Sequence, residues 1–121
     1  MRALVPAMEQ AGIRRLVAIS AGGVAESIAQ LTTPARWLVT RGNIAVAYQD
    51  LARMEAVVRA SALDWLAVRP VTLAHGAPTG GAGPVTRYGL TSMVRRSDVA
   101  AWMLQALERR EPFAERTVLS V

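Results

Sequence analysis

Three residues with chemically useful side chains follow the two most apolar short runs of the chain. Ser20 comes directly after Leu16-Val17-Ala18-Ile19, whereas Thr72 and then His75 come soon after Trp65-Leu66-Ala67-Val68. A hydroxyl group can hold a polar ligand atom, and a histidine can give up or accept a proton near neutral pH. The three residues therefore predict a small-molecule site in which they are the candidate catalytic groups.

Each of these residues also has a plainer interpretation. Ser20 could cap the end of a strand, and an exposed histidine without a function is common in a loop rich in glycine and proline, such as the one around His75. Arg69 and Asp98 are interpreted as a structural ion pair that fixes this loop. Trp37, Trp65 and Trp102 are expected to fill the core or an interface.

The composition removes several kinds of chemistry. The chain has no cysteine, which excludes disulfides, thiolate nucleophiles and Cys-ligated zinc, and its single histidine cannot form a multi-histidine metal site, so we expect no metal. Lysine is also absent, since all 14 basic residues are arginine. Schiff-base chemistry and a Tyr-x-x-x-Lys dyad are therefore excluded.

The charge pattern does not favour a nucleic-acid or membrane partner. The net charge is +5, but the arginines are scattered singly or in pairs and have no aromatic residues interleaved with them. No apolar run approaches the roughly 18 residues of a membrane span, and residues 1–12 do not resemble a signal peptide. We expect a cytoplasmic protein that binds neither nucleic acid nor membranes.

Hydrophobic periodicity predicts alternating helices and strands. We expect helices over residues 2–11, 44–60 and 98–110, the last capped by Ser97, and strands over 16–19, 65–68 and 117–121. Residues 71–92 hold many glycines and are expected to form a long loop, with a short hairpin near 85–87. This order predicts an α/β fold of about three mostly parallel strands with helices on both faces, in one domain over 1–121.

The same elements resemble the C-terminal half of an atypical short-chain dehydrogenase/reductase of the NmrA-like, NAD(P)H-binding type that includes the biliverdin/flavin reductases. The matching segments are AMEQAGIRRLVAISAGG (7–23), YQDLARMEAVVRASALDWLAVRPVTL (48–73), Pro78-Thr79-Gly80 and VRRSDVAAWMLQAL (94–107). The resemblance covers nearly the whole chain and implies a truncated Rossmann-like domain.

The resemblance also implies which residues would contact the cofactor. Ser20 and Ala21 correspond to the strand end that lines the nicotinamide, and Pro70, Val71 and Thr72 correspond to the segment that packs beside it. Thr72 stands where the biliverdin/flavin reductases carry a histidine. Tyr48 begins Tyr-Gln-Asp-Leu-Ala, so the family's Tyr-x-x-x-Lys dyad is missing.

The Gly-x-x-Gly-x-x-Gly turn, which binds the pyrophosphate at a helix N-terminus in the family, is not in this chain. Three functions stay open. The first is a reductase-like protein that keeps only the nicotinamide and substrate half of the site and binds NAD(P)H weakly or not at all by itself. The second is a non-catalytic oligomeric binding or scaffold module. The third is a cofactor-independent small-molecule enzyme that uses the strand-end pocket.

Two further expectations concern partners. The family's strand order gives the strand over residues 15–20 a neighbour on each side, and one of these belongs to the missing half. An uncovered apolar edge of this kind favours a homodimer or higher homo-oligomer. The main pocket should lie beyond the strand ends and be largely apolar, which favours an aromatic or other flat ligand.

Overall fold

The structure is a computed structural model that describes residues 1–24, 28, 29, 31, 33, 34, 37, 45–89, 91–113 and 117–120, the last of these as backbone only. Helices and strands alternate along most of the chain. In order they are α1 (Leu4–Gln10), β1 (Arg15–Ile19), α3 (Ala45–Arg59), β2 (Asp64–Pro70), β3 (Thr72–Ala74), β4 (Gly83–Pro84), β5 (Met93–Arg95), α4 (Arg96–Glu108) and β6 (Thr117–Ser120).

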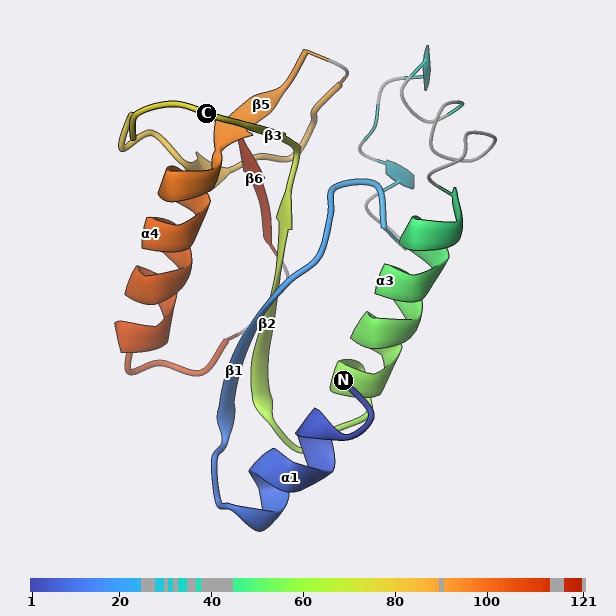
Figure 1. The fold of residues 1–121 in the computed structure, drawn as a ribbon, viewed down its shortest axis with the longest axis vertical. Helices are drawn as coiled ribbons and strands as arrows, with labels where there is room; N and C mark the ends of the chain where they lie inside the picture. The colour runs from blue at the N-terminus through green and yellow to red at the C-terminus, as the bar shows by residue number, and fades with distance from the viewer. Residues whose placement is uncertain are drawn as a thin grey trace.

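The main sheet has the strand order β1-β2-β6-β4. Strands β1, β2 and β6 run parallel, and β1 pairs with β2 over its whole length, from Arg15 opposite Asp64 to Ile19 opposite Val68. Helix α4 lies on one side of this sheet, and α1 and α3 lie on the other (Figure 1). The predicted small Rossmann-like fold, with parallel strands between two helical layers, is confirmed.

The segment over 71–92 contains more regular structure than its glycine content predicts. Its first residues form β3, which pairs in parallel with β5 in a second small sheet, and Gly83–Pro84 form β4, which pairs antiparallel with β6. The predicted hairpin near 85–87 is wrong, because Tyr88 bridges instead to Leu31, far away in sequence. Strands of two or three residues with distant partners leave no local periodicity to detect.

One helix boundary follows local chemistry and another differs from expectation. Helix α1 ends before Gly12, whose φ of 70° suits the left-handed turn that stops a helix. Helix α4 begins at Arg96, so Ser97 lies inside its first turn and does not cap it. Strand β5 runs directly into α4, so Arg95 occupies the N-cap position, and its side chain makes no capping hydrogen bond.

Alternation along β2 divides the core between the two faces of the sheet. Leu66 and Val68 belong to a cluster on the α4 side that also contains Val71, Tyr88, Val94, Val99 and Ala106. On the other side, Val5 and Met8 of α1 pack with Val58 of α3 and with Leu63, and Trp65 and Leu16 pack against them.

The three tryptophans do not all meet the expectation of burial. Trp65 and Trp102 pack against the two core clusters as partly buried residues. Trp37 is 60% exposed, so it does not lie in the core, and its place in an interface stays a prediction.

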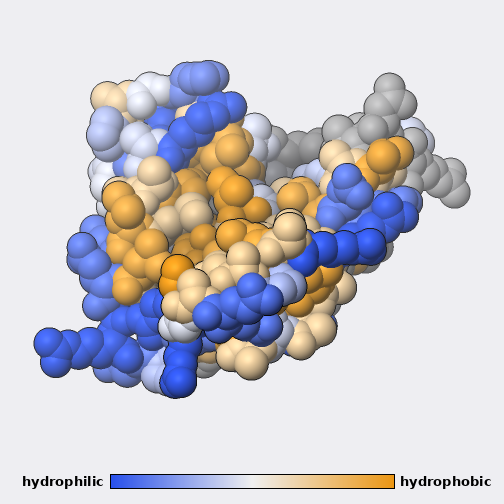
Figure 2. All heavy atoms as spheres, turned by 60° about the horizontal axis from the view of Figure 1, so that its bottom comes forward, coloured by the Kyte–Doolittle hydropathy of each residue, from blue (hydrophilic) through white to orange (hydrophobic). Residues whose placement is uncertain are grey.

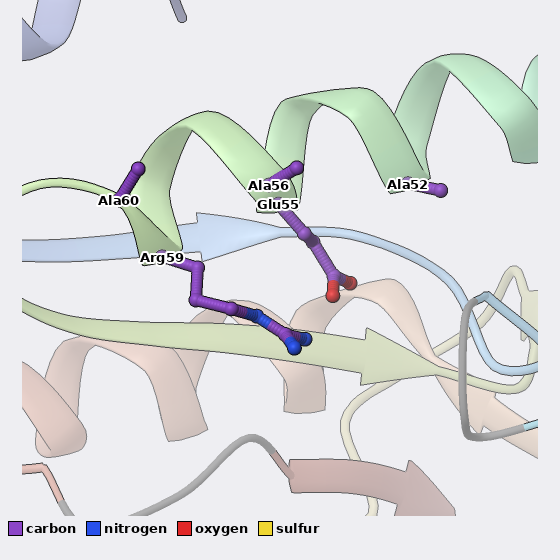
Figure 3. Close-up of a pocket in the computed structure, with 5 residues that line it drawn as sticks. All are labelled: Ala52, Glu55, Ala56, Arg59 and Ala60. Atoms are coloured by element: carbon purple, nitrogen blue, oxygen red, sulfur yellow. The ribbon is translucent and has the colours of Figure 1, made fainter.

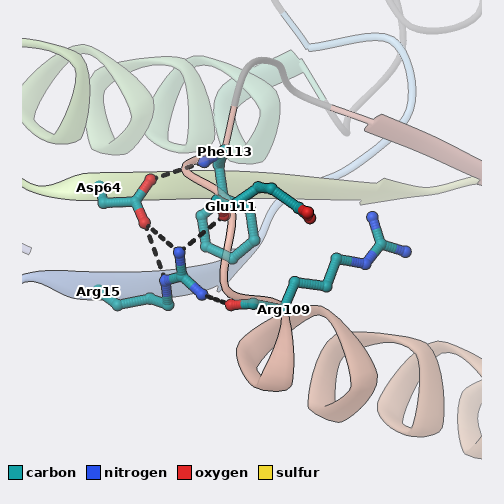
Figure 4. Close-up of polar contacts among 5 residues, drawn as sticks. All are labelled: Arg15, Asp64, Arg109, Glu111 and Phe113. Atoms are coloured by element: carbon teal, nitrogen blue, oxygen red, sulfur yellow. Dashed lines mark hydrogen bonds and ion pairs between the residues drawn. The ribbon is translucent and has the colours of Figure 1, made fainter.

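A network around Arg15 fixes the amino-terminal ends of β1 and β2 to the segment after α4 (Figure 4). The Arg15 guanidinium donates to the Asp64 carboxylate over 2.8 Å and to the carbonyl oxygens of Arg109 and Glu111, and it lies 4.6 Å from the centre of the Phe113 ring. The other oxygen of Asp64 accepts from the Phe113 N–H. The network lies at the amino-terminal edge of the sheet, opposite to the carboxyl-terminal edge at which open α/β sheets bind ligands.

In the part of the chain that the structure describes, no helix is long and apolar enough to cross a membrane. Within the same residues, no group of three or more metal-ligating side chains is present.

Candidate functional site at the strand ends

The carboxyl ends of β1 and β2 are joined by backbone hydrogen bonds beyond the regular pairing. The Ser20 N–H donates to the Val68 carbonyl over 2.7 Å, and the Gly22 N–H donates to the Pro70 carbonyl over 2.9 Å. The segment 20–22 therefore lies alongside the end of β2, which brings Ser20 and Ala21 next to Pro70. In open α/β sheets ligands bind at this edge.

Ser20 carries a buried hydroxyl group without a partner. The residue is 8% exposed, and among the described residues its Oγ makes no hydrogen bond. Leaving a buried polar group unsatisfied costs about 1–3 kcal/mol, so such a group is rare unless a ligand or water completes it. The Ser20 hydroxyl is therefore the best candidate in this region for contacting a polar ligand atom.

Tyr88 covers the backbone just after Ser20. The residue is 5% exposed, and its ring lies so close to Gly22 that an added Cβ at Gly22 would be 2.9 Å from Tyr88 Cε2. Gly22 is thus required by the close approach of an aromatic ring. Through this contact Tyr88 brings part of the segment 71–92 against the residues that follow β1.

A second phenol lies near Tyr88. Burial raises the pKa of Tyr48 above its ordinary value of 10.0, and the neighbouring Tyr88 raises it further. Tyr48 is half-buried in the first turns of α3. Tyr48 thus lies near Tyr88, the aromatic residue that covers Gly22.

The predicted residues on β2 and after it divide into two groups. Pro70 and Val71 are buried beside the strand ends, as a lining role requires. Thr72 is exposed and belongs to β3, where it pairs with Met93. The structure therefore brings Ser20, Ala21, Pro70 and Val71 together and leaves the Thr72 side chain at the surface.

His75 is also exposed, and Arg95, the residue before α4, holds its backbone in place. The Arg95 guanidinium donates to the His75 carbonyl oxygen. It also lies close to Gly76, whose φ is 131° and whose added Cβ would be 2.8 Å from Arg95 Nη1. No hydrogen bond within the described residues joins His75 to Ser20, so a shared catalytic role depends on a ligand that reaches both.

Asp98, in the first turn of α4, binds the next part of the same loop. Its carboxylate accepts from the Thr79 hydroxyl at 2.7 Å, from the Thr79 N–H at 3.0 Å and from the Gly80 N–H at 3.1 Å. These hydrogen bonds, first that of the Thr79 hydroxyl, lower the pKa of Asp98 below its ordinary value of 3.8. The loop over 75–80 is thus held at both ends by α4 and the residue before it.

The predicted ion pair between Arg69 and Asp98 is wrong. Arg69 instead pairs with Glu55 of α3, with Nε 2.9 Å from Oε1 and Nη2 2.5 Å from Oε2. Alternation along β2 explains the difference, because Arg69 points to the α3 side of the sheet whereas α4 lies on the other. The Asp98 carboxylate instead accepts hydrogen bonds from Thr79 and Gly80.

A groove of about 370 Å³ runs along α3 between Ala52 and Ala60. In Figure 3, Glu55 and Arg59 extend from α3 toward the sheet, and Ala52, Ala56 and Ala60 leave room because their side chains are short. This groove is separate from the strand ends. The predicted apolar pocket at Ser20 and Pro70 stays a prediction.

A protein-family model matches most of this sequence. The model described as NAD(P)H-binding matches residues 1–110. The chain belongs to this NAD(P)H-binding family. A comparison with curated proteins finds no match.

Solved structures with the same fold support the assignment. ChuY from Escherichia coli CFT073 is similar, with a TM-score of 0.76 and 27% identity over 98% of this chain and 62% of that chain. ChuY from Escherichia coli O157:H7, described as an anaerobillin reductase, has a TM-score of 0.76 and 29% identity over 98% of this chain and 55% of that chain. A Veillonella parvula short-chain dehydrogenase/reductase in complex with NADP shares the fold at a TM-score of 0.75 and 18% identity, over 98% of this chain and 56% of that chain.

The chain thus spans about half to three fifths of the length of these relatives. The predicted resemblance to one half of an NAD(P)H-binding reductase is confirmed. Among the described residues, the buried Ser20 hydroxyl is available to hydrogen-bond a polar group of such a cofactor. Within the described residues, however, no glycine-rich turn leads from a strand into a helix to receive the phosphates.

Sequence reasoning missed Tyr88 as a residue of the strand ends. The available signal was that Tyr88 is the only aromatic residue in the segment 71–92. An isolated aromatic residue in a loop rich in glycine needs a surface to cover, and a Gly-Gly pair at the end of a strand offers one.

Proposed function

We propose that the chain is a cytoplasmic, reductase-like protein that binds the nicotinamide end of NAD(P)H and a flat aromatic substrate at the carboxyl ends of β1 and β2. The observation that carries the proposal is the buried, unpartnered hydroxyl of Ser20 beside the hydrogen-bonded strand ends. An aromatic substrate suits the apolar surroundings. The description of one ChuY relative as an anaerobillin reductase supports this substrate class.

Each predicted site residue has a distinct role in this proposal. Ser20 donates a hydrogen bond to the ligand, and Ala21, Pro70 and Val71 form the apolar wall beside the nicotinamide. Thr72 and His75, which are exposed, contact only the part of a ligand that reaches the mouth of the site, where His75 would supply a proton.

Dinucleotide affinity of the chain alone should be weak. The pyrophosphate would have to bind arginine side chains, which lose conformational freedom on binding, whereas a glycine-rich turn offers fixed backbone N–H groups. We expect a dissociation constant near millimolar and no measurable hydride transfer from NADPH to a flavin or a tetrapyrrole.

A non-catalytic binding module is the second candidate. It is favoured by the absence of lysine from the chain and by the lack of any described contact between His75 and Ser20, since these leave no proton donor fixed beside the site. A cofactor-independent enzyme at the same strand ends would need the same proton donor.

The test is a heteronuclear NMR titration of the chain with NADPH. We expect shifts concentrated at residues 20–23 and 70–71, and Ser20→Ala should weaken the affinity about five- to tenfold, the equivalent of one hydrogen bond. Thr91→Ala, which removes an exposed hydroxyl, is the matched control. Shifts that avoid both strand ends, or an affinity unchanged by Ser20→Ala, would contradict the proposed site, and complete absence of binding would favour the non-catalytic module.

A further inference from the structure

The Ser20 hydroxyl, which the proposed function uses to bind a ligand, is closed off from solvent. Its Oγ is buried and has no hydrogen-bond partner, and the whole residue is 8% exposed. A ligand atom can therefore reach this oxygen only after a nearby side chain has moved away. The residues around the end of β1 show which side chain that is.

Tyr88 lies on the side of the strand end toward which the Ser20 side chain points. The N–H groups of Ser20 and Gly22 both donate to carbonyls of β2, so the alternation of β1 continues as far as Gly22. Positions 20 and 22 therefore face the same side. An added Cβ at Gly22 would be 2.9 Å from Cε2 and 3.1 Å from Cζ of Tyr88, which places the ring on that side.

The position of Tyr88 relative to α3 agrees with this placement. Ser20 has the parity of Leu16, which packs against the core cluster on the α3 side of the sheet. Tyr88 lies near Tyr48 of α3 and raises the pKa of that phenol. Its ring also belongs to the cluster on the α4 side, so it packs past the end of β1, where the two sides of the sheet meet.

The Tyr88 side chain can leave this place without the movement of a strand. Before it, Gly83–Pro84 pair with β6, and after it the Gly89 N–H donates to the Ser92 hydroxyl over 3.0 Å. Arg87, the residue directly before Tyr88, is exposed. Rotation about the side-chain bonds of Tyr88 therefore carries the phenol toward solvent while both anchors stay in place.

We infer that Tyr88 is a specificity-determining residue of the site, an inference that rests on the proposed function. Its ring fills the place of the ligand ring in the free chain, and a planar ring of similar size exchanges with it and reaches Ser20. The space that the phenol leaves is bounded by the backbone of Gly22, where even a Cβ would be too close to a ring. A flat ring with one polar substituent fits this space, whereas a puckered sugar does not.

The exchange lowers the apparent affinity of the site. A ligand that binds only the open form has its affinity reduced by the fraction of chains that are open. Burial of an aromatic side chain favours the closed form by a factor of about ten or more. Removal of the Tyr88 ring should therefore tighten binding of a flat ligand, whereas removal of an aromatic residue that served as a wall of the site would weaken it.

Access to the site is measured on a single introduced thiol, because the chain has no cysteine. Ser20→Cys should react slowly with iodoacetamide, and Tyr88→Ala in the same chain should raise the rate about tenfold or more. Gly22→Ala should also raise the rate, because its methyl group pushes the ring away. Tyr88→Phe, which keeps the ring, is the matched control and should leave the reaction slow.

A second thiol separates local opening from a general loosening of the fold. Val58→Cys places it in the buried cluster with Val5 and Met8, between α1 and α3. Figure 2 turns this α1 end of the molecule forward and shows apolar side chains gathered there among charged ones. The reaction of Val58→Cys should be unchanged by Tyr88→Ala and by Gly22→Ala.

Three results would overturn the closing role of Tyr88. The first is fast reaction of Ser20→Cys while Tyr88 is present. The second is a rate that neither Tyr88→Ala nor Gly22→Ala changes. The third is an equal rise at Ser20→Cys and Val58→Cys in both variants, because Tyr88 would then act only as a core residue.

NADPH binding separates this inference from the proposed function. Tyr88→Ala should bind NADPH about tenfold more tightly than the wild-type chain, and Ser20→Ala should weaken binding in both backgrounds. If Ser20→Ala weakens binding but Tyr88→Ala does not tighten it, the role of Tyr88 is overturned and the proposed site stands. Absence of NADPH binding in every variant would overturn the proposed function and the exchange with it, while the two thiols would still decide whether Tyr88 closes the site.

Discussion

Glu55 of α3 and Arg69 of β2 form a two-bonded ion pair in the interior of the protein, where their side chains are 1% and 4% exposed. The pair joins the helix that carries Tyr48 to the strand that ends at Pro70. It therefore connects two of the elements that form the candidate site, directly across one face of the sheet.

Removal of one partner from this pair should be strongly destabilising. Glu55→Ala removes the carboxylate that accepts from both Nε and Nη2 of the buried Arg69 guanidinium, and removal of one partner of a buried ion pair costs about 3–5 kcal/mol. Urea denaturation followed by circular dichroism measures the loss. Asp50→Ala, which removes a 3.4 Å surface pair with Arg53, is the control and should cost less than about 1 kcal/mol. Equal effects of the two substitutions would contradict the interior role of Glu55.

The parallel core was predictable from sequence because its strands, 15–19 and 64–70, contain unbroken apolar runs that only a doubly covered sheet accommodates. Glu55 was missed although a signal was present. It lies four residues after Leu51 and three before Val58, so helical spacing places it on the apolar stripe. A carboxylate at such a position and an arginine at the end of an apolar strand are expected partners.

The small strands and the role of Tyr88 could not be predicted in the same way. Strand β3 pairs with β5 and β4 pairs with β6, over separations that no local pattern records. The contact of Tyr88 with Gly22 depends on the path of the whole intervening chain. The position of Ser20 at the end of β1, by contrast, could be predicted because the end of an apolar run is a local feature.

Gly22 should tolerate no side chain while Tyr88 keeps its place. The Cβ of Gly22→Ala would lie 2.9 Å from the Tyr88 ring, closer than real contacts, and overpacking of this kind costs about 1–3 kcal/mol. Gly83→Ala, where the nearest atom is 4.0 Å from the added Cβ, is the matched control for thermal unfolding.

The same contact can be separated from backbone effects by a double-mutant cycle. Tyr88→Ala gives the methyl group of Gly22→Ala space, so the two substitutions together should lower the free energy of unfolding by less than the sum of their separate effects. Additive effects of the two substitutions would show that the ring and Gly22 are not in contact in solution.

The loop over 75–80 should loosen in acid. Because the folded pKa of Asp98 is lowered, the contribution of its hydrogen bonds is complete above the ordinary value of 3.8 and is lost as the pH falls through the lower folded value. Amide hydrogen exchange at Thr79 and Gly80 should therefore become faster, relative to the core of β2, only below about pH 4.

Asp98→Asn should produce the faster exchange at neutral pH. It removes the charge and leaves one oxygen where the carboxylate had two, while Asp50→Asn on the surface of α3 serves as the control. If exchange at Thr79 is unchanged in Asp98→Asn, the loop is held by other contacts, such as that of Arg95 with His75.

Tyr48 should remain protonated above the pH at which a free phenol ionises. Burial raises its pKa from 10.0, and Tyr88 raises it further, so the stability that comes from the neutral phenol is present below pH 10 and is lost as the pH rises beyond it.

The chain has two tyrosines, so Tyr88→Phe leaves Tyr48 as the single phenol in an ultraviolet absorbance titration. We expect the midpoint in Tyr88→Phe to lie above 10.0 and below that of Tyr48 in the wild-type chain. The same variant unfolded in urea should titrate near 10, which provides the internal reference. A folded midpoint at or below the unfolded one would mean that Tyr48 is solvated, and its burial beside Tyr88 would be wrong.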